Sequence, residues 1–221
     1  MLGGALMGWP AAIARVAERI GIVEWLNTRL AWDPAQCRLS PGVRLFALMV
    51  AFLVDPCALY RMSECFEPLD CKILFGPSVH AQDLTDDALG RALLKLHAAQ
   101  PAQIFAELSA RAIAAYDLPP TDAVHGDTTT LTLYGEYPDA EPEEEKEKTP
   151  ASAATAADPS SAPPETAVPR RGYNKDGHPD AKQLVLGAVT RPDGIPVVFS
   201  QEAQNPSRIH CGNGLTNPPK L

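Results

Sequence analysis

The sequence has no excess of basic residues and few aromatic ones. It contains 221 residues, with 19 Lys and Arg against 27 Asp and Glu, which gives a net charge of −8. A strongly basic balance would indicate binding to nucleic acid through phosphate neutralisation, and this chain lacks that signal. With 45% hydrophobic residues, the composition also excludes collagen-like, disulfide-dense and wholly disordered chains. The length suffices for one or two hydrophobic cores.

The sequence also lacks paired cysteines at metal-binding spacing. The cysteines are odd in number and form no CxxC pair, so no zinc framework follows, and an oxidised secreted scaffold is not indicated at this length. We expect them to be small core residues. They are Cys37, Cys57, Cys65, Cys71 and Cys211.

No hydrophobic run is long enough for a membrane helix. The longest one, residues 43–54, is interrupted by Arg44 and falls short of the roughly 20 apolar residues that a span needs. It is therefore predicted to form a buried helix. The first 15 residues have no basic segment ahead of their apolar residues, which makes them a poor signal peptide. We expect a cytoplasmic protein with no membrane partner.

Residues 1–118 are predicted to form a helical domain. Apolar residues recur at three- and four-residue spacing from Pro10 to Leu26, which predicts one amphipathic helix that ends near Asp33. Ser40 and Pro41 form an N-cap and a first helical position, and the helix that follows, to about residue 54, is apolar on nearly all sides and is expected to be central.

Three further helices are predicted in the same domain. A short one covers residues 59–66. Another begins at residues 85–87, where acidic side chains lie near the positive end of the helix dipole. The last runs from Pro101 to about Tyr116.

The composition changes after residue 118. Residues 121–137 are rich in β-branched and aromatic residues and predict a strand. Residues 182–190 and 195–199 predict two more strands, joined as an antiparallel hairpin by the turn at residues 191–194. Between them, residues 138–168 carry eight acids against two lysines and are rich in Pro and Ala, which predicts a disordered acidic insertion.

Asp127 is the acidic residue that stands out by its position. It lies inside the β-rich run, where a carboxylate is costly unless it is paired, hydrogen-bonded or bound to metal. Two interpretations of Asp127 from the residues alone stay open. It either accepts hydrogen bonds from nearby backbone amides at a strand end, or it is a metal ligand.

Three blocks of sequence resemble the front of the catalytic domain of bacterial insertion-sequence DDE transposases, which have a ribonuclease H-like core. The first block is His125-Gly126-Asp127-Thr128-Thr129-Thr130-Leu131-Thr132-Leu133-Tyr134-Gly135-Glu136-Tyr137. The second is Gly172-Tyr173-Asn174-Lys175-Asp176-Gly177-His178-Pro179-Asp180-Ala181-Lys182-Gln183-Leu184-Val185-Leu186-Gly187, and the third is Gly194-Ile195-Pro196. The block at residues 83–91 is similar to a helical domain of unknown function that precedes the core in one branch of the family.

The resemblance implies a fold, a domain order and one site residue. The fold is α+β: a helical domain at 1–118, the first core strand at 119–137, the acidic insertion at 138–168, and the second and third strands at 169–204. These strands would form an incomplete ribonuclease H-like mixed sheet. Asp127 matches the first acid of the DDE triad, which together with two further acids holds Mg²⁺ or Mn²⁺ for DNA cleavage and strand transfer. The DNA would be the transposon ends.

The sequence departs from the family's pattern after the third strand. Residues 205–221 match nothing in the family and resemble out-of-frame translation, and the second and third acids have no match. One carboxylate does not assemble a two-metal site. We therefore expect a transposase fragment truncated after the third core strand, inactive alone and holding no stable metal. The alternative is a helical DNA-binding or dimerisation module that interacts with, or inhibits, an intact transposase.

The remaining candidates for a functional role are weaker. His125, His178 and Asp180 have two interpretations. They either form a metal cluster, or they are loop residues that order the connection between strands. Four cations near the insertion are candidates for phosphate contact, against their interpretation as a solvated face. They are Arg170, Arg171, Lys175 and Lys182.

Overall fold

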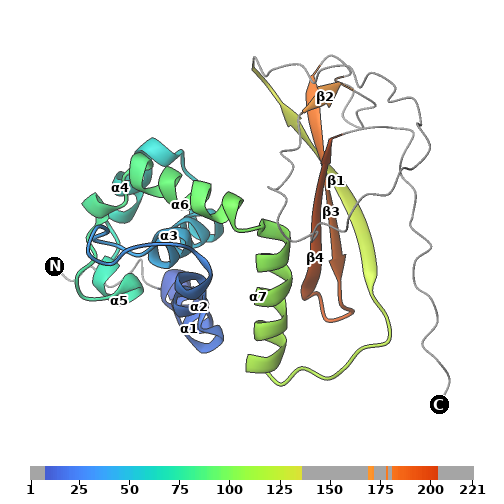
Figure 1. The fold of residues 1–221 in the computed structure, drawn as a ribbon, viewed down its shortest axis with the longest axis horizontal. Coiled ribbons are helices and arrows are strands. Elements are labelled where there is room, and N and C mark those ends of the chain that lie inside the picture. The colour runs from blue at the N-terminus through green and yellow to red at the C-terminus, as the bar shows by residue number, and fades with distance from the viewer. Residues whose placement is uncertain (1–7, 136–168, 172–177, 179–180, 204–221) are drawn as a thin grey trace, which may run out of the picture. The chain divides into compact units, whose positions relative to one another are not determined.

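Seven α-helices are followed by an antiparallel sheet, and the protein is α+β (Figure 1). The computed structural model describes residues 8–135, 169–171, 178 and 181–203. The chain divides into two units, residues 1–120 and residues 121–221. The predicted insertion at 138–168 and the predicted tail at 205–221 lie outside the described residues.

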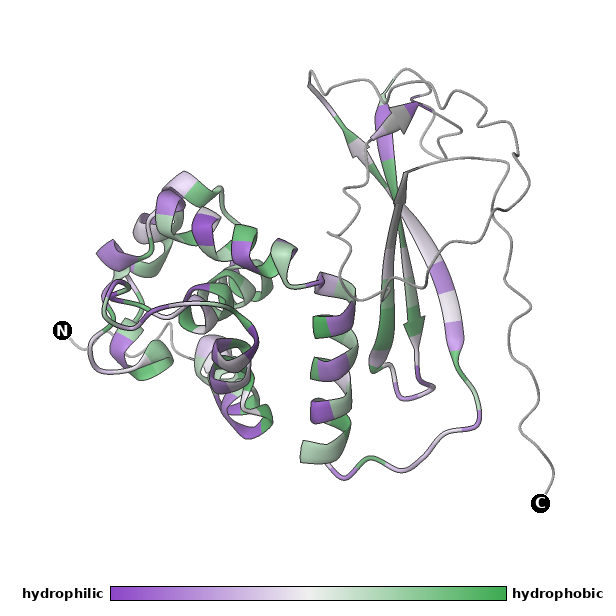
Figure 2. Cartoon of the chain, viewed as in Figure 1, coloured by the Kyte–Doolittle hydropathy of each residue, from purple (hydrophilic) through white to green (hydrophobic). Residues whose placement is uncertain are grey.

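From residue 8 onward, the helical unit contains seven α-helices and two short 3-10 turns. They are α1 (Gly8–Ile20), α2 (Ile22–Arg29), α3 (Pro41–Val54), η1 (Leu59–Arg61), α4 (Met62–Phe66), α5 (Cys71–Phe75), η2 (Ala81–Asp83), α6 (Asp86–Ala98) and α7 (Pro101–Ala115). In α7, hydrophobic and hydrophilic bands alternate along the helix, as expected of an amphipathic helix (Figure 2).

Side-chain caps begin α3 and α6 where the sequence predicts them. The Val43 amide donates to Ser40 Oγ (3.3 Å), and Pro41 takes the first helical position. The Ala88 amide likewise donates to Thr85 Oγ1 (3.3 Å). Each cap satisfies an amide that has no partner inside the helix, so both predicted starts are confirmed.

The single helix predicted from Pro10 onward is wrong, because the chain turns at Gly21. This residue has φ of 72° and ψ of 39°, a left-handed conformation that glycine adopts without steric cost. Its amide donates to the carbonyl of Ala17 (2.9 Å), which closes α1, and α2 begins at the next residue. The apolar spacing continues through the turn, and for that reason it does not reveal the break.

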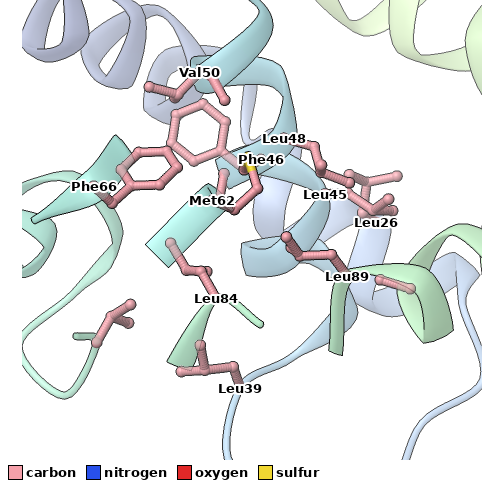
Figure 3. Close-up of a cluster of buried hydrophobic side chains, with 14 of the residues drawn as sticks. Leu26, Leu39, Leu45, Phe46, Leu48, Val50, Met62, Phe66, Leu84 and Leu89 are labelled. Atoms are coloured by element: carbon pink, nitrogen blue, oxygen red, sulfur yellow. The ribbon is translucent and has the colours of Figure 1, made fainter. Parts of the chain in front are cut away.

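Helix α3 is central to the hydrophobic core of the helical unit (Figure 3). Its residues Leu45, Phe46 and Val50 are almost fully buried, and the ring of Phe46 meets that of Phe75 edge to face with centroids 5.6 Å apart. The last turn of α3 differs from the prediction, since Phe52 is 72% exposed and Leu53 is 68% exposed. The helix is therefore covered over its first three turns only.

The described part of the chain contains no single helix that is long and apolar enough to span a membrane. Helix α3 and the segment Leu59–Phe66 meet the length and composition criteria only when taken together, and they are bent by 97° at the break between them.

Gly42 allows α2 and α3 to approach closely, and we expect Gly42→Ala to destabilise the helical unit. A Cβ atom there would lie 2.4 Å from the carbonyl oxygen of Val23 and 2.7 Å from Asn27 Oδ1. The Gly42 amide also donates to Asn27 Oδ1 (2.9 Å). Overpacking of this kind costs about 1–3 kcal/mol, so the midpoint of chemical unfolding should fall.

Gly90→Ala is the matched control for Gly42→Ala. Gly90 lies inside α6, and no atom lies within 4 Å of the position of its Cβ. This variant should gain about 0.5–1 kcal/mol, because alanine is the better helix former. Equal effects of the two substitutions in urea unfolding would contradict the close approach of α2 to α3.

Three long antiparallel strands and one two-residue strand form the sheet. They are β1 (His125–Leu133), β2 (Arg170–Arg171), β3 (Lys182–Thr190) and β4 (Pro196–Ala203). Strand β3 is central: β1 pairs with its whole length on one side, while β2 and β4 pair with successive parts of it on the other. The predicted hairpin of the second and third strands is confirmed, and β4 continues to Ala203 beyond the predicted residue 199.

A hydrogen-bonded turn joins β3 to β4. The Gly194 amide donates to the carbonyl of Arg191 (2.9 Å), and Gly194 has φ of 84°, which favours glycine. The buried Arg191 guanidinium donates to both carboxylate oxygens of Asp193, at 3.2 Å to Oδ1 and 2.9 Å to Oδ2. These hydrogen bonds are the main reason that the pKa of Asp193 lies below its ordinary value.

We expect an NMR titration to place the pKa of Asp193 below the ordinary aspartate value of about 3.9. Because the folded-state pKa is lowered, the contribution of this carboxylate to stability is present above that ordinary value. It is lost as the pH falls through the folded-state pKa. In Arg191→Lys, which lacks the planar two-pronged donor, the pKa should rise back toward the ordinary value. An unchanged pKa in that variant would show that Arg191 does not set it.

The sheet contributes nothing to the buried hydrophobic core among the described residues. All the buried hydrophobic side chains lie between Ala17 and Ile104. In the described strands, the buried side chains are the polar ones of Lys182 and Gln183. The described sheet is thus held by its hydrogen-bonded ladders and by half-covered side chains.

Candidate functional site

Asp127 is the third residue of β1, and it pairs with Ala188 of β3, which in turn pairs with Phe199 of β4. Since residues directly opposite each other in a sheet share a face, Asp127 lies on the face that carries these small and apolar neighbours. His125 lies on the same face two residues earlier. The carboxylate is therefore placed on the first long strand of the sheet, beside the central one.

The neighbouring row of the sheet has a glycine at its centre. Thr128 pairs with Gly187, and Gly187 pairs with Ser200. A Cβ atom at Gly187 would lie 2.5 Å from Ser200 Oγ and 4.0 Å from Thr128 Cγ2. A side chain at Gly187 would therefore require the Ser200 hydroxyl to rotate away.

The carboxylate of Asp127 is exposed, so the expected cost of burying it does not arise. Its Oδ1 accepts a hydrogen bond from the Thr128 amide (2.8 Å). This contact is the local backbone interaction that the structural interpretation of Asp127 expects. Exposure also leaves the group accessible to solvent ions, so the metal interpretation stays a prediction.

The described residues do not fit a two-metal centre. None of their His, Cys, Asp and Glu side chains form a group of three that could hold a metal ion. His125 is exposed, and His178 meets the ring of Tyr134 edge to face, with centroids 6.3 Å apart. Asp180, the third member of the conceivable cluster, lies outside the described residues.

Two of the four predicted phosphate-binding cations, Arg171 and Lys182, pair with each other at the start of β3. Arg170 and Arg171 form β2, where Arg171 pairs with Lys182 and Arg170 pairs with Gln183. Arg171 is exposed, whereas Lys182 is 9% exposed. Lys175 lies outside the described residues. The sheet thus places two cationic residues directly opposite each other, and of these two Arg171 is the one open to solvent.

Sequence reasoning missed a cluster of three sulfur atoms in the helical unit. The Cys57 thiol donates to the Met62 thioether sulfur (3.5 Å), and Cys65 lies close enough to affect the pKa of Cys57. Burial, followed by the nearby Cys65 thiol, raises the pKa of Cys57 to about 11. The available signal was the placement of Met62 and Cys65 three residues apart on one short helix, with Cys57 just before it.

The fold defines an α+β protein in which a helical unit precedes an antiparallel sheet. Residues 7–110, which cover most of that helical unit, match DUF4277, a domain of unknown function. No curated protein and no solved structure matches the chain.

Proposed function

We propose that this chain carries the helical domain and the front of the catalytic core of an insertion-sequence transposase of the DDE type. The observation that carries the proposal is the position of Asp127, on the first of three consecutive long antiparallel strands, next to the central strand. The resemblance of the three sequence blocks implies this strand for the first acid of the triad. The proposal is further supported by a helical domain of unknown function ahead of the sheet, as in the branch that the sequence resembles.

Within this proposal, Asp127 supplies one of the carboxylates that hold divalent metal ions. When bound, Mg²⁺ or Mn²⁺ in such enzymes activates the attacking hydroxyl and stabilises the leaving oxygen. Among the described residues, Asp127 is not part of any group of three His, Cys, Asp or Glu side chains that could hold a metal ion. The purified 221-residue chain should therefore show no metal-dependent cleavage or strand transfer on DNA, and its activity depends on two acids from elsewhere.

The substrate in this proposal is the DNA of the transposon ends, in the cytoplasm. The chain has a net charge of −8, so contact with DNA depends on local cations rather than on overall charge. Arg171, exposed on β2 opposite the first residue of β3, is the cation that we assign to phosphate contact.

The second candidate function is an interaction module that binds, or inhibits, an intact transposase. Large apolar side chains on the surface of the helical unit favour it, because exposed apolar patches often mark protein interfaces. Phe52 and Leu53 are 72% and 68% exposed at the end of α3, and Tyr60 is 74% exposed in η1. A homodimer or a complex with an intact transposase would cover such residues.

Reading the coding DNA past codon 208 is the test that separates these functions. The transposase proposal expects a frame that continues the core and adds two acids, and an extended protein that joins transposon ends to target DNA with Mg²⁺. An extended protein with both acids that neither cuts nor joins DNA would overturn it. The interaction module instead expects the 221-residue chain, with no extension, to inhibit an active transposase when the two are mixed.

A further inference from the structure

The three sulfur side chains of Cys57, Met62 and Cys65 lie together at the start of α4. Cys57 is in the loop before η1, Met62 is the first residue of α4, and Cys65 is one turn further on. The Cys57 thiol donates to the Met62 sulfur at 3.5 Å, and Cys65 is near enough to raise the pKa of Cys57. Cys57 therefore lies near both a thioether and a second thiol.

The cluster lies where the core meets the surface. Met62 is 1% exposed and packs among the core residues around Phe46 and Leu84 (Figure 3). Cys57 and Cys65 are both half-buried. A ligand can thus reach the two thiols from solvent, while the thioether is fixed on the inner side by the packing around it.

The separation of the Cys57 and Met62 sulfur atoms suits a shared metal ion. With metal–sulfur distances like those of zinc thiolates, about 2.3 Å, three sulfurs around one ion lie about 4 Å apart. The observed separation of 3.5 Å between Cys57 and Met62 is close to this value, so a small outward movement of side chains admits the ion. The two half-buried thiols, rather than the packed Met62, would make this movement.

We propose that Cys57, Met62 and Cys65 form a binding site for a soft monovalent cation, copper(I). Thiolate and thioether ligands together select copper(I), whereas structural zinc sites use four Cys or His ligands. In the described residues, no third Cys, His, Asp or Glu joins the two thiols, so the usual zinc set is not formed there. Binding would release the two thiol protons and leave a centre with one negative charge. The charged groups that act on Cys57 are Asp55 and Arg61, and Arg61 is paired with Glu64 at 3.1 Å.

A competition experiment tests the proposal: the copper(I)–bicinchoninate complex is added to the reduced full-length chain, and transfer of copper(I) from the chelator to the protein is measured. We expect one ion per chain to move to the protein. Loss of an outer-shell partner alone costs about 10–100-fold in metal affinity, so Cys57→Ser or Cys65→Ser should cost at least as much. Cys37→Ser is the matched control, because Cys37 is also half-buried but lies outside the cluster, and it should bind copper(I) as the parent does.

X-ray absorption on the selenomethionine-labelled protein tests the thioether independently of any variant. A copper–selenium path is expected in the labelled parent, and it should disappear in Met62→Leu, a substitution close in volume. If copper in the labelled parent has sulfur neighbours but no selenium neighbour, Met62 is not a ligand and the three-sulfur site is overturned. Unchanged copper(I) affinity in both serine variants would also overturn the proposal, as would a higher affinity for zinc than for copper(I). A further contrary result is a reduced protein that binds no copper(I) and that forms a Cys57–Cys65 disulfide on oxidation.

Discussion

Asp127→Ala, made in an extended protein that carries all three acids, is expected to lower the rate of strand transfer by several orders of magnitude. Activation of the attacking hydroxyl and stabilisation of the leaving oxygen by bound metal each contribute several kcal/mol. Loss of one ligand disturbs both effects at once. Asp127→Asn should behave in the same way, because the amide keeps the shape of the side chain but not its negative charge.

Binding of the transposon ends should survive both Asp127 substitutions. The carboxylate is exposed and accepts a hydrogen bond from Thr128, and we assign the phosphate contacts to other residues. Activity would be followed by strand transfer on labelled ends, and binding by an electrophoretic shift at fixed salt concentration. Asp122→Ala, at another exposed aspartate ahead of β1, is the control and should retain full activity. An Asp127→Ala enzyme with a tenth of the parent activity would show that another residue is the first acid.

Local signals predicted three of the longer helices of the helical unit, each of which begins at a cap or a proline. Ser40 and Thr85 cap α3 and α6 as expected, and α7 begins at Pro101. The failures are at places where no such signal interrupts the apolar pattern. Gly21 turns the chain between α1 and α2, while the hydrophobic spacing continues on both sides.

Helix α5 was not predicted because five residues are too few to show a period. Its start depends on Asp70, whose Oδ1 accepts hydrogen bonds from the amides of Lys72 (3.0 Å) and Ile73 (3.2 Å). The packing of Phe75 against Phe46 and Phe66 then holds the turn in place. Such tertiary contacts are not visible in a short stretch of sequence.

The candidate site was only partly predictable for a related reason. β-Branched residues located the strand that carries Asp127, and the β3–β4 hairpin followed from its turn. Whether the carboxylate is covered depends on what packs over the sheet face, and a strand pattern does not contain that information. The sulfur cluster likewise depends on how the loop holding Cys57 returns to α4, which residue spacing alone leaves open.

Separate expression of the two halves of the chain should give opposite results. Residues 1–118 contain all the buried hydrophobic side chains of the described structure, from Ala17 to Ile104, and should fold alone as a helical domain. Far-ultraviolet circular dichroism should show helix, and thermal unfolding should be cooperative.

Residues 119–221 are expected instead to aggregate or to stay unfolded. The described strands pair only with one another, and Leu131 and Val198 are 45% and 48% exposed. In the described residues, β1 pairs along one edge only, with β3, and an edge with open amides and carbonyls recruits further strands. The described strands add no buried apolar core, and hydrogen-bonded ladders by themselves do not offset the entropy of ordering the chain. Gel filtration and light scattering would measure the outcome. A soluble monomer with cooperative unfolding would show that this half has a core of its own, which would count against its assignment as part of a larger catalytic core.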